Sequence, residues 1–132
     1  MTAQKAFETA LNLINQREED GEYILNIEDL RKNAVSYLNI LTISLYELDC
    51  KIRGVACNID NNTPEELESL DSALTLHKSL CGAAVPYGLA FMLLLEEEPE
   101  RAEKFHLLYK EECARVERLC TKGRRHGIKE VY

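Results

Sequence analysis

An apolar run with a proline and a glycine at its centre, residues 80–95, limits the fold of this chain more than any other stretch. Both flanks of the run have the composition of a buried helix. Pro86, however, lacks a backbone N–H and clashes with the preceding turn of a helix. Gly88 leaves a gap in the side-chain surface and adds backbone freedom. The run therefore predicts a buried helix that bends at Pro86 and is closely approached by another backbone near Gly88.

Apolar residues recur at steps of three and four along almost the whole chain, which is the period of a helix that buries one face. We predict an all-α fold, a bundle of about four helices plus one short helix, in a single domain spanning residues 1–132. The second main helix is apolar on more than one side and is expected to be the central one. The first, third and fourth main helices are expected at residues 3–17, 76–96 and 99–123, and the second from its cap at Asn26 to near Gly54.

Glycine, proline and small polar residues mark the expected helix ends. Gly21 is a candidate left-handed cap after the first helix, and Asn26 is a candidate cap before the second. Thr63 followed by Pro64 is typical of a helix start, so a short helix is predicted from Pro64, with its end left open. Gly123 is expected to close the last helix.

Two segments are predicted to lie outside the helices. Turn-forming residues are concentrated in residues 54–62, which we interpret as a surface loop that orders against a partner. Residues 124–132 are basic and are expected to form a loose C-terminal tail.

Composition excludes some functional classes. The net charge of −7 disfavours a general nucleic-acid binder, which is normally basic. No signal peptide and no apolar stretch of membrane-spanning length is visible, so a cytosolic protein is expected. The five cysteines are odd in number and form no Cys-x-x-Cys pair, which indicates reduced thiols.

Charge is unevenly distributed along the chain. Residues 115–129 carry six basic side chains against one acidic one, so the rest of the chain is strongly acidic. Such asymmetry can mark a contact with nucleic acid or with an acidic partner. Alternatively, cations gather at a helix C-terminus because the helix dipole favours them there. The candidate contact residues are Arg118, Lys122, Arg124, Arg125 and Lys129.

No pattern of residues indicates catalysis or a bound cofactor. Glu103 and His106 have the spacing used in di-iron bundles, but the second such motif is absent. His77 and Cys81 share a helix face, yet zinc normally needs further ligands with paired local spacing. We therefore expect no catalytic residues, no metal and no cofactor, and interpret these side chains as structural or solvated.

Three blocks of sequence resemble a family of tailed-phage and prophage proteins. The first is Val85-Pro86-Tyr87-Gly88-Leu89-Ala90, the second is the acidic link Glu96-Glu97-Glu98-Pro99, and the third places Phe105, Tyr109 and Glu112 along one helix. The chain is thereby similar to the small helical head–tail connector, or adaptor, proteins of phages. The likeness also extends to the N-terminal helices and covers most of the chain outside the 54–62 loop and the basic tail.

The resemblance implies a structural role. Adaptors of this kind assemble as a homo-oligomeric ring beneath the portal, extend the DNA channel and dock tail-side proteins. DNA is then only transiting cargo, no membrane is involved, and the protein passes from the bacterial cytoplasm into the virion. The alternative from the residues alone is a small regulatory or interaction module that binds nucleic acid or protein through its basic C-terminus.

Packing at the first block can be tested by substitution. We predict that Tyr87 and Gly88 lie between the third and last main helices, with Pro86 bending the chain over Phe105 and Tyr109. Gly88→Leu should then cost about 1–3 kcal/mol by overpacking.

Overall fold

The structure is a computed structural model that describes residues 1–15, 27–57 and 64–131, with Asn15 and residues 122–131 described through their backbone alone. These parts are all-α, as predicted, and contain no strand beyond an isolated bridge between Thr2 and Ala73. The expected caps Gly21 and Asn26, and most of the 54–62 loop, lie outside the described residues. The helices are α1 (Ala3–Asn15), α2 (Ile27–Arg53), α3 (Lys78–Cys81), α4 (Ala84–Leu94) and α5 (Pro99–Val131).

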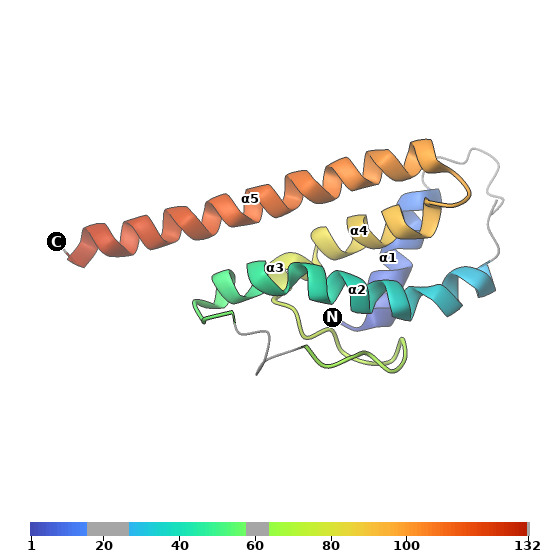
Figure 1. Cartoon of the computed structure of the whole chain (residues 1–132), viewed down its shortest axis with the longest axis horizontal. Helices are drawn as coiled ribbons and strands as arrows, with labels where there is room; N and C mark the ends of the chain where they lie inside the picture. Colours follow the sequence, from blue (N-terminus) through green and yellow to red (C-terminus); the bar gives the residue numbers. More distant parts are fainter. Residues whose placement is uncertain (16–26, 58–63, 132) are drawn as a thin grey trace.

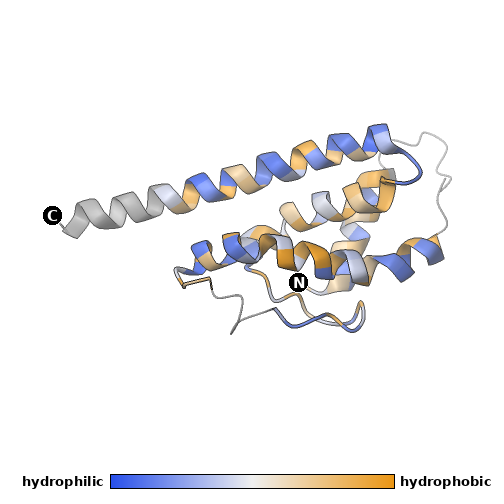
Figure 2. Cartoon of the chain, in the orientation of Figure 1, coloured by the Kyte–Doolittle hydropathy of each residue, from blue (hydrophilic) through white to orange (hydrophobic). Residues whose placement is uncertain are grey.

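The central helix is α4, and the expectation that the second main helix holds this place was wrong. Helix α4 packs against each of the other four helices and lies between α2 and α5 (Figure 1). Eight of its eleven residues are buried, so it is apolar on every side. A helix that is hydrophobic all round is stable only when other elements cover it on all sides. The longer α2 keeps an outer face that is polar toward both ends but exposes Ile40 and Ile43 in the middle (Figure 2).

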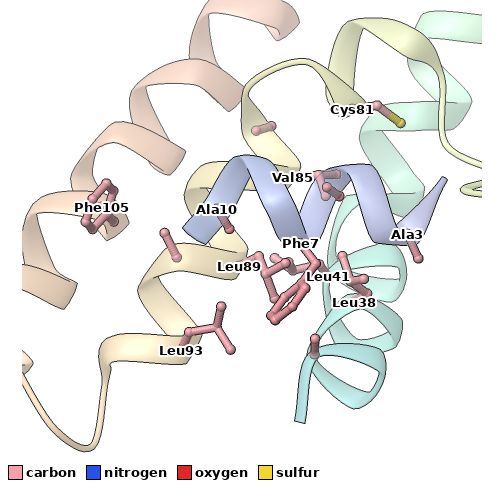
Figure 3. Packing of buried hydrophobic residues seen from close by; sticks show 14 of the residues in the cluster. Ala3, Phe7, Ala10, Leu38, Leu41, Cys81, Val85, Leu89, Leu93 and Phe105 are labelled. Carbon is pink, nitrogen blue, oxygen red and sulfur yellow. The ribbon is translucent and has the colours of Figure 1, made fainter. Parts of the chain in front are cut away.

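The core forms where α1, α2 and α5 meet this apolar helix. Phe7 of α1, Leu38 and Leu41 of α2, and Leu89 of α4 point toward one another in the close view (Figure 3). Phe7 and Leu89 are completely buried. A buried side chain of this size contributes about 1.5–3 kcal/mol to stability through loss of apolar surface to water. The first, second, fourth and fifth helices therefore share one hydrophobic core.

The helix is interrupted before Pro86 and does not bend at this residue, so the predicted Pro-bent helix was wrong. The run expected as one helix is two, α3 and α4, separated by Gly82 and Ala83. A proline ring clashes with the carbonyl four residues earlier, which here belongs to Gly82. Pro86 itself lies in the first turn of α4, where a missing N–H costs no helical hydrogen bond. The first such bond joins Tyr87 N–H to the Ala83 carbonyl at 3.0 Å.

No helix begins at Pro64, which corrects the expected short helix there; the short helix is α3. Residues 64–68 are extended across α2. The Asn39 side chain binds both backbone groups of Leu67, accepting from its N–H at 2.7 Å and donating to its carbonyl at 3.2 Å. A helix would need those backbone groups for its own ladder. Tertiary contact with Asn39 thus overrides the local start signal.

The segment that follows caps the first helix. The N–H groups of Ala3 and Gln4 donate to the carbonyls of Ser72 and Leu70, at 2.9 and 2.7 Å. The first N–H groups of any helix lack partners inside the helix, so carbonyls from elsewhere must satisfy them when water cannot. Residues 70–74 therefore fix the start of α1.

Helix α5 does not end at Gly123, and the predicted loose tail was wrong. The helix continues through residues 124–131 to Val131. A glycine inside a helix costs only about 1 kcal/mol relative to alanine, so flanking helix formers can carry the helix past it. At its other end, Arg101 pairs with Glu98 at 3.0 Å and also donates to the Ile14 carbonyl, which joins the start of α5 to the end of α1.

Candidate interaction sites

Gly88 is the point of closest approach between α4 and its neighbours. A Cβ atom at this position would lie 2.5 Å from Leu41 Cδ2 and 3.1 Å from Tyr109 Cδ2. The glycine is buried and helical, so its role here is to leave room and not to permit an unusual backbone angle. The absence of a side chain lets α2 and α5 both pack directly on the α4 backbone.

The motif residues around Gly88 are mostly buried. Val85, Pro86, Leu89 and Ala90 are almost or completely inaccessible, whereas Tyr87 is half-buried. The third motif block lies on α5, where Phe105 is buried and Tyr109 is half-buried against the core. The first and third blocks, which lie on consecutive helices, therefore meet at the α4–α5 contact.

Tyr109 has an environment that opposes ionisation. Its partial burial, together with the neighbouring Cys113 thiol, raises the pKa of the Tyr109 phenol to about 12. Burial also raises the pKa of the Cys113 thiol. Removing a group from water disfavours its charged form, which accounts for the direction of both shifts. Both groups are therefore neutral at physiological pH, and both pack against the core.

A groove of about 520 Å³ lies beside Tyr109, between α2 and α5. Leu45 and Leu48 of α2 and Ala114 of α5 contribute to its lining. Lys51 of α2 and Glu117 of α5 form an ion pair at 3.0 Å that joins the two helices across the groove. Both side chains are about half exposed, so this pair contributes about 1 kcal/mol or less.

The candidate metal ligands His77 and Cys81 form hydrogen bonds within the protein. His77 caps α3: its Nδ1 accepts from the Ser79 N–H at 3.2 Å and lies 2.8 Å from the Ser79 hydroxyl. The Cys81 thiol donates to the Leu76 carbonyl at 3.5 Å. Within the described part of the chain, no three histidine, cysteine or acidic side chains gather as a metal site requires.

His106 stacks on an aromatic ring. Its imidazole lies 4.5 Å from the Phe91 ring, centroid to centroid, at an interplanar angle of 20°. Its Nδ1 is 3.8 Å from Glu103 on the next turn. The stacking joins α4 and α5 near their connection, and the contact with Glu103 lies within α5.

One buried charged residue was missed by sequence reasoning. Asp49 accepts from the His77 backbone N–H at 2.7 Å and from Arg53 Nε at 3.0 Å. Arg53 in turn donates to the Thr75 carbonyl at 2.9 Å. Asp49 thus connects the end of α2 to the N-cap of α3 through a hydrogen bond. The available signal was its register: it lies four residues after Leu45, on the buried stripe of α2.

All five cysteines are free thiols, in agreement with the prediction. Cys57, in the segment that follows α2, forms a side-chain hydrogen bond with Cys50 on the last turns of α2. Gly54 makes the intervening turn with a positive φ of 70°. This short turn returns the chain onto the end of α2.

The candidate contact residues all lie on α5. Arg118 is exposed, and Arg115 pairs with Glu112 at 2.6 Å. The hydrogen bond from Arg115 lowers the pKa of Glu112. Lys122, Arg124, Arg125 and Lys129 follow on the same helix backbone, and their side chains lie outside the described residues. The candidate contact residues thus belong to a continuous helix.

Neither protein-family models, nor curated proteins, nor solved structures give a match to this chain. Among the described helices, none combines the length and the apolar character needed to cross a bilayer.

Proposed function

We propose that this protein is a structural subunit of a phage or prophage head–tail connector, which forms or joins a ring beneath the portal. The observation that carries the proposal is the meeting of two motif blocks. Gly88 of the Pro-Tyr-Gly block lies against Tyr109 of the Phe-x-x-x-Tyr block, so the residues that resemble the adaptor family form one packed junction. This junction supports the proposal, because one internal contact would explain why both blocks occur together.

The proposal implies a set of partners. The ring would be built from copies of this chain, with portal protein on one side and tail-side proteins on the other. DNA passes through as cargo and is not held by specific contacts. The strongly acidic character of the chain outside residues 115–129 supports this role, because negative walls repel the phosphate backbone of transiting DNA. The protein would leave the bacterial cytoplasm as part of the virion.

Deletion of the gene from an inducible lysogen tests the proposal. The expected result is DNA-filled heads without attached tails, restored to tailed particles by the wild-type gene supplied in trans. Portal, capsid and tail genes on either side of the gene would support the same conclusion. Infectious tailed particles at the normal yield in the deletion strain would overturn it.

The second candidate is a regulatory or interaction module that binds nucleic acid through its basic C-terminus. It is favoured by one observation, the continuation of α5 as a helix through residues 115–129, because a rigid basic helix can lie along a phosphate backbone. Binding to a labelled duplex of about 20 base pairs should then weaken steeply between about 50 and 200 mM salt. Absence of binding at the lower salt concentration would reject this candidate.

A further inference from the structure

Two neighbouring side chains in the second half of α5 are exposed to solvent. Arg118 is exposed and has no ion pair within the described residues, and Leu119 is 55% exposed. The helix continues from there to Val131, through the basic residues of the sequence. We refer to residues 115–129 of α5 as the basic helix end.

Complementary charge lies around a hollow of about 290 Å³ between the first turns of α2 and the last turn of α4. Asp29, Glu96 and Glu97 line it, all exposed and none with an ion pair within the described part of the chain. Lys32 also lines the hollow and offsets one of the three charges, while Tyr37, Met92 and Leu93 supply carbon surface. We call this feature the acidic hollow.

The two features lie at opposite ends of the molecule. The acidic hollow is beside the α4–α5 connection, and the basic helix end is at the far end of α5 (Figure 1). A helix of 33 residues is about 50 Å long. Complementary patches so far apart cannot meet within one copy. They can meet between copies, as a heterologous contact that repeats from one subunit to the next.

We propose that the basic helix end of one copy docks in the acidic hollow of the next copy. The guanidinium of Arg118 suits this hollow because it pairs with carboxylates through two parallel hydrogen bonds. Its aliphatic stem can lie on Tyr37 and Met92, as the stems of long cationic side chains do on apolar surface. The inference rests on the proposed function in one respect: it names the junction from which the ring would be built.

A second copy fits these observations better than DNA does. The net charge of −7 opposes the approach of a second copy as well as of a polyanion, but only a second copy brings a basic helix end to the acidic hollow. The hollow also has carbon walls, which match the stem of a side chain and have no counterpart in binding a phosphate backbone. The partner that the surface fits is therefore another copy of the same chain.

Two neutralised variants of the full chain test the junction. E96Q/E97Q removes charge from the acidic hollow, and R118Q/R124Q/R125Q removes it from the basic helix end. Matched controls are E65Q/E66Q and K5Q/K78Q, which neutralise exposed residues elsewhere. Nuclease-treated protein at up to about 500 μM would be studied by sedimentation equilibrium at about 50 and 500 mM salt. Circular dichroism would check that every variant is folded.

The expected results are specific to a two-ended junction. Wild type and both controls should associate at low salt and dissociate at high salt. Each neutralised variant should associate about tenfold or more weakly, the size expected from losing two or three exposed ion pairs. An equimolar mixture of the two neutralised variants should form a 1:1 dimer and nothing larger, because each variant keeps one intact end.

Three results would overturn the proposal. The first is that wild type stays monomeric at the highest concentration and low salt. The second is that either neutralised variant associates as tightly as wild type. The third is that the mixture of the two neutralised variants stays monomeric. Loss of DNA binding in R118Q/R124Q/R125Q with unchanged self-association would assign the basic helix end to nucleic acid instead. Normal tailed particles from the deletion lysogen would refute the connector role and leave the self-association result standing, so the two failures are distinguishable.

Discussion

Replacement of Gly88 by alanine tests how closely the central helix is packed. The added Cβ would lie 2.5 Å from Leu41 Cδ2, below the 3.0 Å that real Cβ atoms respect, and 3.1 Å from the Tyr109 ring. The Leu41 methyl group or the helices must therefore move. Overpacking of this kind costs about 1–3 kcal/mol. Against this cost, alanine stabilises a helix relative to glycine by about 0.5–1 kcal/mol.

A matched glycine separates the two effects. Gly82 is exposed, has an ordinary φ of −72°, and would place a Cβ 3.8 Å from its nearest atom, the Lys78 carbonyl oxygen. Gly82→Ala should therefore be neutral or stabilise by about 0.4–1 kcal/mol. Urea denaturation followed by circular dichroism would give the free energy of unfolding of both variants. Gly88→Ala is expected to be about 1–3 kcal/mol less stable than Gly82→Ala.

The opposing atom is identified by a double-mutant cycle with Leu41→Ala. Removal of the Leu41 methyl groups should relieve part of the strain, so that Gly88→Ala costs at least about 1 kcal/mol less in this background than in wild type. Only the contact with Tyr109 would then remain. Equal stability of Gly88→Ala and Gly82→Ala would refute the close-approach reasoning, and an unchanged cost in the Leu41→Ala background would refute the role of Leu41. The larger Gly88→Leu should be at least as destabilising.

Other contacts give further predictions. Asp49→Ala should lower the free energy of unfolding by about 1–3 kcal/mol, because the partly buried His77 N–H loses its acceptor. A similar loss in the exposed control Asp71→Ala would contradict this. Asn39→Ala should lower the free energy of unfolding by about 1–2 kcal/mol and increase hydrogen exchange at the Leu67 amide. Unchanged exchange would argue against the hydrogen bonds between Asn39 and Leu67. Absorbance at alkaline pH should show Tyr109 ionising near pH 12. Because its pKa in the folded state lies above the unfolded value near 10, its contribution to stability should be complete below pH 10 and should be lost as the pH rises toward 12. The variant Tyr109→Phe should not show this loss.

The helical periodicity of the sequence was enough to predict the all-α class, because burial of one face repeats every three to four residues wherever a helix packs on a core. Its errors arose where a distant residue decides the local structure. Thr63 and Pro64 carry a valid helix-start pattern, yet Asn39 occupies the backbone groups of Leu67. Pairings across such separations leave no periodic signal in the sequence.

The positions of helix breaks were also hard to predict. Pro86 predicted a bend inside one helix, and this was wrong, because the clash of its ring acts on Gly82, four residues earlier, where the helix is interrupted. Gly123 indicated an end that does not occur, because a glycine permits a turn without requiring one. For the candidate sites, charge asymmetry identified the basic residues, whereas the acidic hollow joins α2 to α4 and could be recognised only once these helices were placed.

The bonds that fix α1 imply an order of events during synthesis of the chain. The N–H groups of Ala3 and Gln4 find their acceptors only when Ser72 and Leu70 have been made. The Ile14 carbonyl can accept its hydrogen bond only after Arg101, 87 residues further along the chain, has been made. Contacts between residues so distant in sequence form late and slow folding. We therefore expect the first helix to be made early but anchored late, with its apolar face exposed on the ribosome until most of the protein has emerged.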